Sequence, residues 1–210
     1  MPCCPLCNTA CLDIFSKIQQ KTYYNCPTCN GVFLDAIYFL SAEEEKARYE
    51  LHNNDIHNIG YQKFVSPIVE DVRTHYSKQH KGLDYGSGSG PVITSLLRDS
   101  KYDITTYDPY FDPNQNALSG NYDYIVCCEV MEHFYTPFKE FNMLHSLLVP
   151  GGRLFCKTTL YQPGVKFETW WYKNDPTHVF FYSENTLLWI QKNIGFSELF
   201  LTKNLITFLK

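Results

Sequence analysis

The sequence lacks the features that would assign it to a membrane or to a nucleic-acid surface. It contains no run of 18 apolar residues, so we expect no membrane-spanning helix. Its first residues, MPCCPLC, do not have the pattern of a secretory signal peptide, and we therefore expect a cytoplasmic protein. Positive charge is also scarce, since 18 Lys and Arg stand against 22 Asp and Glu. This balance disfavours a protein whose main task is to bind nucleic acid phosphates.

Cysteine is nearly absent after residue 29. Six of the nine cysteines lie before residue 30, and such clustering without a signal peptide points to a metal site rather than to disulfides. The motifs CPLC and CPTC are two C-x2-C pairs with 18 residues between them, a spacing that fits a four-cysteine zinc site. We therefore expect a zinc ribbon over residues 1–40, with zinc bound by Cys4, Cys7, Cys26 and Cys29.

The remaining cysteines leave alternatives open. Cys3 could replace Cys4 as a ligand, and Cys11 adds a further thiol nearby. The four cysteines could also be reduced thiols or a redox pair. The later cysteines lie in apolar patterns typical of strands, and we expect them to be small core residues: Cys127, Cys128 and Cys156.

The predicted ribbon is electrically neutral, because Lys17 and Lys21 are balanced by Asp13 and Asp35. A neutral module is a poor phosphate binder, which favours a structural or substrate-capping role for it.

A connecting segment is expected over residues 41–60. Ser41 followed by Glu44 predicts a capping box at the start of a helix. Beyond this helix, a polar cluster is expected in a solvated loop, although it could also face a site: His52, Asn53, Asn54 and His57.

The stretch GLDYGSGSG, residues 82–90, connects a predicted strand to a predicted helix and is therefore not a linker. Pro91 suits an early helix position, where its missing N–H costs nothing. The dinucleotide fingerprint G-x-G-x-x-G fails, because its third glycine would fall on Pro91 or Ile93, and no Walker Gly-Lys-Ser/Thr is present. The pattern that is present is D-x-G-x-G-x-G, formed by Asp84, Gly86, Gly88 and Gly90.

An acidic residue follows the next predicted strand. In YDITTYDPY, Asp108 stands at the strand's end, where a carboxylate can accept hydrogen bonds from both hydroxyls of a ribose. The chain predicts strands near 81–85, 102–107, 122–128, 152–158, 197–203 and 204–210, with the last two antiparallel.

In this order, LDYGSGSG, TYDPY, YDYIVCCEVMEHF and LLVPGGRLF resemble the class I S-adenosylmethionine-dependent methyltransferases. The segment DPTHVFFYSENTLLWIQKNIGF resembles the branch that includes the ubiquinone-type O-methyltransferases, and the front half looks like zinc-ribbon-bearing members of the superfamily. The resemblance covers about residues 61–210 and implies a doubly wound, Rossmann-like α/β domain. It also implies S-adenosylmethionine as the cofactor.

The same resemblance assigns roles within the cofactor site. The backbone from Gly86 to Gly90, with Ser87 and Gly88, would pack against the methionine part of the cofactor. Asp84 would support this loop and the cofactor's ammonium group, and Asp108 would hold the ribose. Cys128 and Glu129 would lie beside the sulfonium.

The sequence departs from the family between Asp108 and Tyr122, where only 13 residues stand. A helix and a third strand do not fit in this space, so we expect the edge strand to be absent. Phe111 or loop backbone would then cover the adenine, and Asp112 is a weaker candidate to bind it.

The acceptor side is expected in FETWWYKNDPTHVFFYS. Candidate pocket residues are Trp170, Trp171, Tyr172, His178 and Tyr182, of which about half are expected to be core residues. His178 is the preferred general base and His133 the second candidate, since both are histidines near the expected pocket. The acceptor is expected to be a small molecule. An RNA methyltransferase whose ribbon presents the substrate and a non-catalytic cofactor-binding module remain the alternatives.

Overall fold

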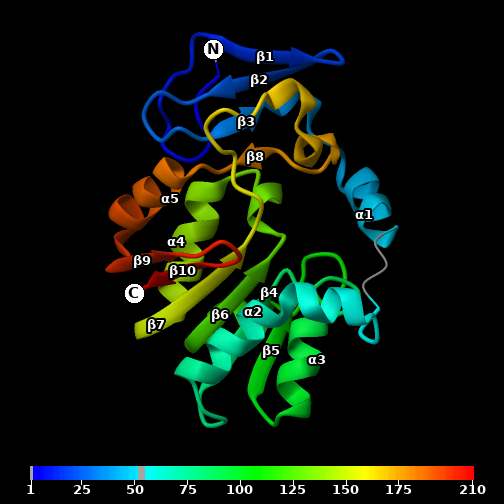
Figure 1. Cartoon of the computed structure of the whole chain (residues 1–210), viewed down its shortest axis with the longest axis vertical. Helices are drawn as coiled ribbons and strands as arrows, with labels where there is room; N and C mark the ends of the chain where they lie inside the picture. Colours follow the sequence, from blue (N-terminus) through cyan, green and yellow to red (C-terminus); the bar gives the residue numbers. More distant parts are fainter. Residues whose placement is uncertain (1, 52–54) are drawn as a thin grey trace.

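A computed structural model of the chain describes residues 2–51 and 55–210. The prediction of a polar cluster at His52, Asn53 and Asn54 falls outside these residues. The chain forms two β-sheets, of which the smaller lies at one end of the molecule and the larger forms the centre of the body (Figure 1).

The larger sheet is mixed and has the strand order β5-β4-β6-β7-β10-β9. Its strands are β4 (Lys81–Tyr85), β5 (Asp103–Tyr107), β6 (Tyr122–Cys128), β7 (Leu148–Lys157), β9 (Glu198–Leu201) and β10 (Ile206–Leu209). Strands β5, β4, β6 and β7 are parallel, whereas β10 is antiparallel to both of its neighbours. Along the described part of the chain, no further strand follows β5 before β6 begins. Strand β5 therefore lies at the edge of the sheet.

Helices cover both faces of this sheet. They are α2 (Ile59–His75), α3 (Val92–Asp99), α4 (Pro137–Leu147) and α5 (Glu184–Ile190). Along β6, Tyr124 and Val126 pack with α2 and α3, while Ile125 and Cys127 pack with α4 and α5. This alternation is the two-residue period of a strand that is buried on both faces. The predicted α/β class is therefore confirmed.

Local signals set several helix boundaries. The predicted capping box starts α1 (Ala42–Glu50), because Ser41 Oγ accepts from the Glu44 N–H and the Glu44 carboxylate accepts from the Ser41 N–H. Helix α2 begins at Ile59, within the expected connecting segment 41–60, because the Asn58 side chain caps it. In the part of the chain that the structure describes, no helix has both the length and the hydrophobicity needed to cross a membrane.

The smaller sheet has the order β1-β2-β3-β8 and is antiparallel. Its strands are β1 (Ile14–Ile18), β2 (Lys21–Asn25), β3 (Val32–Leu34) and β8 (Phe180–Phe181). Strand β8 comes from the late part of the chain and lies next to β3 (Figure 1). The sequence does not reveal this pairing, because a two-residue strand has no periodicity and exists only through its partner.

The small sheet is buried on both faces. Phe33 and Phe180 belong to the large core that also contains the residues of α4 and α5. The other face, with Tyr23 and Val32, packs against aromatic residues of the late segment, including Phe167. The N-terminal cysteine module and residues 167–181 therefore share two hydrophobic clusters.

A substitution at Gly31 tests the packing between the small sheet and Phe180. A Cβ atom at Gly31 would lie 2.3 Å from Cζ of Phe180, and the Phe180 ring is fully buried. Gly31→Ala should therefore lower the free energy of unfolding by about 1–3 kcal/mol, as overpacking does elsewhere. Urea denaturation measures the change.

Two further variants sharpen this test. Phe180→Leu alone is the reference variant, since it removes the same ring while Gly31 is unchanged. Adding Phe180→Leu to Gly31→Ala should recover part of the loss, because it removes the clashing ring. Fully additive costs would show that the two residues do not meet.

Candidate active site

A cavity of about 840 Å³ opens where the parallel strands β4, β5 and β6 end. Three turns form its wall: Gly86–Gly88 after β4, Asp108–Phe111 after β5 and Cys128–Val130 at the end of β6. The carboxyl edge of a parallel sheet is the usual ligand site of this architecture, and the volume lies in the range of ligand pockets.

The glycine loop is held in a backbone conformation that favours glycine. Gly86 and Gly88 have φ values of +76° and +64°, a region that residues with a Cβ avoid. A Cβ at Gly86 would also lie 2.4 Å from the Val130 side chain. The backbone N–H groups of Gly86 and Ser87 donate to the carbonyl of Tyr107 at 2.8 and 3.1 Å, which ties the loop to the end of β5.

Asp108 joins the same two turns through its side chain. One carboxylate oxygen accepts from the Gly88 N–H at 2.9 Å, and the other accepts from the N–H groups of Tyr110 and Phe111 at 2.9 and 3.0 Å. The carboxylate lines the cavity and is 7% exposed. Because a carboxylate offers about four acceptor positions, one remains for a ligand hydroxyl.

Two residues of the predicted cofactor set lie outside the cavity lining, Asp84 and Gly90. Asp84 is buried, and its carboxylate accepts from the Thr94 hydroxyl at 2.7 Å. This bond anchors the end of β4 to α3, so Asp84 supports the loop from behind. Burial raises the pKa of Asp84 to about 6.

The short segment 109–121 covers one side of the cavity. Phe111 lines the cavity, whereas Asp112 does not. The Asp112 carboxylate accepts from the Thr106 hydroxyl at 2.5 Å, and its backbone pairs with Asp108. Phe111 is therefore available to cover a ligand, and Asp112 closes the turn.

A half-buried and a fully buried glutamate, Glu129 and Glu132, contact the same tyrosine near the end of β6. Glu129 has a φ of +53° and lines the cavity, and Glu132 belongs to a short 3₁₀ turn, Met131–His133, and is 0% exposed. The Tyr172 hydroxyl contacts Glu129 Oε2 at 3.1 Å and also contacts Glu132 Oε1. Burial raises the pKa of Glu129 to about 8 and that of Glu132 to about 7.

Both predicted base candidates line the cavity, His133 and His178. Their Nδ1 atoms lie 3.0 Å from the Thr177 carbonyl and 2.7 Å from the Tyr172 carbonyl, respectively. These bonds place a proton on each Nδ1, which leaves Nε2 as the basic atom of the neutral ring. Nε2 of His178 lies 4.0 Å from Glu132 Oε1.

The predicted aromatic pocket is only partly correct. Trp171 and His178 line the cavity, and Trp171 is 66% exposed. Trp170, Tyr172 and Tyr182 are buried core residues and do not belong to the cavity lining. Their rings pack against the small sheet or against α4, since aromatic residues in a dense core lose most of their exposure.

Several cavity residues were not predicted, because they come from helices that lie far away in the sequence. They are Glu45, Tyr49 and Leu51 of the α1 region, Tyr61 and Phe64 of α2, and Glu140 of α4. The only available signal was the acidic first turn of α1, which resembled a solvated face. Glu45 is instead 7% exposed and accepts from the hydroxyls of Tyr49 and Tyr110 at 2.7 and 2.5 Å.

The cavity lining is acidic and aromatic. Among the described residues it includes Glu45, Asp108, Glu129 and Glu140, but neither Lys nor Arg. Tyrosine hydroxyls partner three of these carboxylates; the Tyr85 hydroxyl, for example, donates to Glu140 at 2.6 Å. The cavity therefore favours neutral or cationic ligands over anionic ones.

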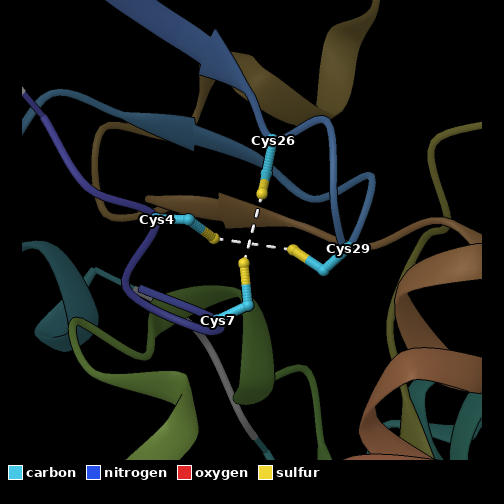
Figure 2. Close-up of side chains that lie close together, drawn as sticks. All are labelled: Cys4, Cys7, Cys26 and Cys29. Carbon is cyan, nitrogen blue, oxygen red and sulfur yellow. Dashed lines mark hydrogen bonds between the residues drawn. The ribbon is translucent and has the colours of Figure 1, made fainter. Parts of the chain in front are cut away.

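The four predicted zinc ligands converge on one point (Figure 2). Sγ of Cys4 lies 3.5 Å from that of Cys29, Sγ of Cys7 lies 3.2 Å from that of Cys26, and all four atoms lie within 4.8 Å of one another. A tetrahedral zinc with Zn–S bonds of about 2.3 Å requires sulfur separations of about 3.8 Å. The donor set therefore fits zinc.

The two cysteine turns have the same backbone geometry. Asn8 and Asn30 follow the second cysteine of each pair, with φ values of +59° and +57°. Their N–H groups donate to the carbonyls of Cys4 and Cys26 at 2.8 and 2.9 Å. The repeated sequence CPxCN encodes this turn, because Asn tolerates the left-handed region. Cys3 is exposed, and the Cys11 thiol is directed to the Thr9 carbonyl at 3.5 Å.

Comparisons with known proteins were made for the whole chain. A family model described as "Methyltransferase domain" matches residues 39–199. No curated protein matches the sequence.

Solved structures with the same fold include three methyltransferase chains. That of Burkholderia thailandensis 1,6-didemethyltoxoflavin-N1-methyltransferase, with bound 1,6-didemethyltoxoflavin and S-adenosylhomocysteine, has a TM-score of 0.59 and 14% identity, covering 95% of this chain and 99% of that one. A chain of the complex between the Haloferax volcanii Trm112 methyltransferase activator and its methyltransferase has a TM-score of 0.56 and 14% identity, covering 80% and 94%. An Archaeoglobus fulgidus SAM-dependent methyltransferase has a TM-score of 0.52 and 15% identity, covering 74% and 100%.

Asp84 generates a prediction about stability and pH. Its pKa is raised from 3.8 to about 6 by burial, so the folded state binds its proton more tightly than the unfolded state does. The stability that this proton provides is complete below about pH 4 and is lost as the pH rises through about 6, by roughly 3 kcal/mol. Asp84→Asn cannot ionise and should therefore gain stability relative to the wild type between pH 4 and 7.

Urea denaturation of both proteins across this pH range measures the difference. Asp13→Asn changes an exposed carboxylate and serves as the control. A constant difference between wild type and Asp84→Asn from pH 4 to 7 would contradict the raised pKa.

Proposed function

Since the chain belongs to the methyltransferase domain family, whose model matches residues 39–199, we propose that it transfers a methyl group from S-adenosylmethionine to a small-molecule acceptor. This proposal rests on the hydrogen bond between the glycine loop and Asp108, where β4 and β5 end. It combines loop backbone that lines the cavity with a carboxylate that retains one acceptor position.

The cofactor would occupy this edge of the cavity. The backbone of Gly86, Ser87 and Gly88 would contact its methionine part, with Gly90 and Asp84 supporting the loop. Asp108 would accept from the ribose, and Phe111 would cover the adenine. Cys128 and Glu129 would lie beside the sulfonium, whose positive charge suits the acidic lining.

A small acceptor is favoured by the size and charge of the cavity. Its volume of about 840 Å³ suits a cofactor and a small molecule, and a lining without Lys or Arg repels nucleic acid phosphates. The Burkholderia enzyme with this fold was solved with both S-adenosylhomocysteine and 1,6-didemethyltoxoflavin bound, which supports a two-ligand arrangement here.

Methyl transfer itself requires alignment of the acceptor atom with the methyl group and the exclusion of water. A base is needed where the acceptor atom begins protonated. His133 and His178 line the cavity and are base candidates. Nε2 of His178 faces Glu132, so this histidine would exchange its proton with that carboxyl group.

We further propose that residues 1–40 form a zinc ribbon, residues 41–60 a connecting segment and residues 61–210 the methyltransferase domain. Cys4, Cys7, Cys26 and Cys29 would hold the ion as four thiolates. The shared clusters between the small sheet and residues 167–181 favour a structural role for the ribbon over substrate presentation.

The cofactor assignment is tested by calorimetric titration with S-adenosylmethionine and S-adenosylhomocysteine. Asp108→Ala should weaken binding at least about 10-fold, since a charge-assisted hydrogen bond is worth about 1.5–3 kcal/mol. Asp108→Asn should lose less, because it keeps one acceptor oxygen. The ligand-free melting temperature of Asp108→Ala should also fall, because three backbone N–H groups lose their acceptor.

Asp112→Asn is the matched control, because Asp112 closes the same turn without lining the cavity. Its affinity should stay near that of the wild type. A wild-type protein that binds neither compound would refute the proposed function, and unchanged affinity in Asp108→Ala would place the ribose elsewhere.

The zinc assignment is tested by elemental analysis of protein purified without chelator. About one zinc per chain is expected, since four thiolates satisfy the ion. Cys26→Ser should reduce the content to less than half and destabilise the ribbon, because metal binding is coupled to folding. Cys3→Ser, which changes an exposed thiol outside the cluster, should keep the full content. Equal zinc contents in the two variants would exclude this ligand set.

A further inference from the structure

The Tyr172 hydroxyl has more hydrogen-bonding contacts than hydroxyl protons can explain. Its oxygen contacts Glu129 Oε2 at 3.1 Å, Glu132 Oε1, and the Thr158 hydroxyl at 2.9 Å. Tyr172 and Thr158 each supply one proton, and every hydrogen bond needs its own proton. Three contacts share two hydroxyl protons, so at least one carboxyl group of the pair must supply the third.

The burial of Glu132 leads to the same conclusion. This side chain is 0% exposed, and its Oε2 atom has no hydrogen-bond partner. A buried carboxylate with an unpaired oxygen is costly, whereas the carbonyl oxygen of a neutral carboxylic acid is much less so. Of the two assignments that place the third proton on a single glutamate, one avoids an unpaired charged oxygen in the core: Glu132 and Thr158 donate to the Tyr172 oxygen, and Tyr172 donates to Glu129.

The groups around the pair do not neutralise two negative charges. The nearest cation is Lys157 of β7, whose ammonium group also contacts the Asn204 carbonyl. On the Glu132 side, Asp175 is paired with Arg48 at 2.7 Å, so this ion pair adds no net charge, and ring nitrogens of His133 and His178 lie within 4.8 Å of a Glu132 oxygen. A hydrogen bond with Cys156 raises the pKa of Cys127, and burial raises the pKa of Cys128 and Tyr182, so these side chains are neutral. Burial also raises the pKa of Tyr61 near Glu129, which is a neutral phenol. Burial raises the pKa of both glutamates, which agrees with one retained proton.

We propose that Glu129, Tyr172 and Glu132 form a shared-proton unit, which holds one proton between its carboxyl groups at neutral pH and receives a second from the methyl acceptor through Glu129. This inference rests on the proposed function and extends it to acceptors that begin protonated, either as a hydroxyl or as an ammonium group. Glu129 lines the cavity and, in this unit, takes the acceptor's proton in place of His133 and His178, which makes it the catalytic residue. Tyr172 and Glu132 are positioning residues, because they act through Glu129.

The chemical step balances within this unit. A lone pair of the acceptor oxygen or nitrogen forms the new bond to the methyl carbon. The bond between that carbon and the sulfonium breaks, and its electron pair stays on sulfur, which becomes a neutral thioether. The acceptor's proton moves to Glu129, before the attack where the acceptor is an ammonium group because the N–H electron pair then becomes the attacking lone pair, and the unit changes from one net negative charge to none. The Tyr172 hydroxyl links the two carboxyl groups, so the charge can be spread over both.

The unit is tested without any acceptor by infrared spectroscopy of the whole protein. The carbonyl stretch of a neutral carboxylic acid, identified by its shift in D₂O, should correspond to about one group per chain at pH 7.5, because the pair titrates as a unit. The signal should rise towards two groups as the pH falls through about 7 and disappear above about pH 9. Asp84→Asn serves as the background protein, which removes the other buried carboxyl group with a raised pKa.

Substitutions in this background assign the signal. Glu132→Gln should abolish the pH 7.5 band, because it removes the group that carries the proton. Glu129→Gln should keep a band but shift its frequency and pH midpoint, because the unpaired Oε2 atom of the buried Glu132 still favours the neutral acid while the charged partner is lost. Tyr172→Phe should shift the frequency and the pH midpoint of the carbonyl band, an effect that loss of packing alone does not produce. Glu140→Gln changes a cavity carboxylate outside the unit and should leave the band unchanged.

The outcomes separate this inference from the proposed function. No acid band at pH 7.5 in the background protein, or a band that either Gln variant leaves unchanged, would overturn the shared-proton unit even if S-adenosylhomocysteine binds. Failure to bind S-adenosylhomocysteine in calorimetry would refute the methyltransferase proposal, whatever the infrared result. A band that is present in the background protein, lost in Glu132→Gln and shifted in Glu129→Gln supports the unit.

Discussion

The geometry of the cavity depends on two hydrogen bonds of the Val179 backbone. Its carbonyl accepts from the Leu34 N–H of β3 at 2.9 Å, and its N–H donates to the Glu132 carbonyl at 2.9 Å. One residue thus links the cysteine-bearing sheet to the turn after β6. His178 precedes Val179 and β8 follows it, so the side chains on either side take their positions from these two bonds. Since Val179 is buried, losing either bond would leave unpaired polar groups away from water.

The second constraint is electrostatic. The cavity gathers four carboxylates without a lysine or arginine in its lining, and tyrosine hydroxyls take the place of cationic partners. A hydroxyl bond stabilises a carboxylate without cancelling its charge, so the negative potential remains available to a ligand. A sulfonium cofactor would supply the missing positive charge on binding. At Tyr172, two carboxyl groups contact one hydroxyl. There, a retained proton limits the repulsion between the two carboxyl groups.

The sequence predicted the parts of this structure that local chemistry determines. The capping box at Ser41, the six strands of the large sheet and the absence of a strand between Asp108 and Tyr122 all follow from nearby residues. Parts that depend on distant partners were missed. Strand β8 exists only because β3 lies beside it, and Glu45 looked like part of a solvated helix turn although two tyrosines bury it. Trp170 and Tyr172 were predicted for the pocket because aromatic character does not distinguish a core from a cavity wall.

The small sheet explains why a cysteine module belongs to this fold. About 40 residues bury too little apolar surface to be stable alone, so such a module needs a metal, a partner surface or both. Here the four sulfurs converge on one point, and both faces of the sheet also contribute to cores shared with the late segment. That segment in turn supplies Tyr172 and His178. The module therefore stabilises the wall of the cavity from outside. A change at its cysteines would alter the positions of the glutamates through Leu34 and Val179, and not through any contact with the acceptor.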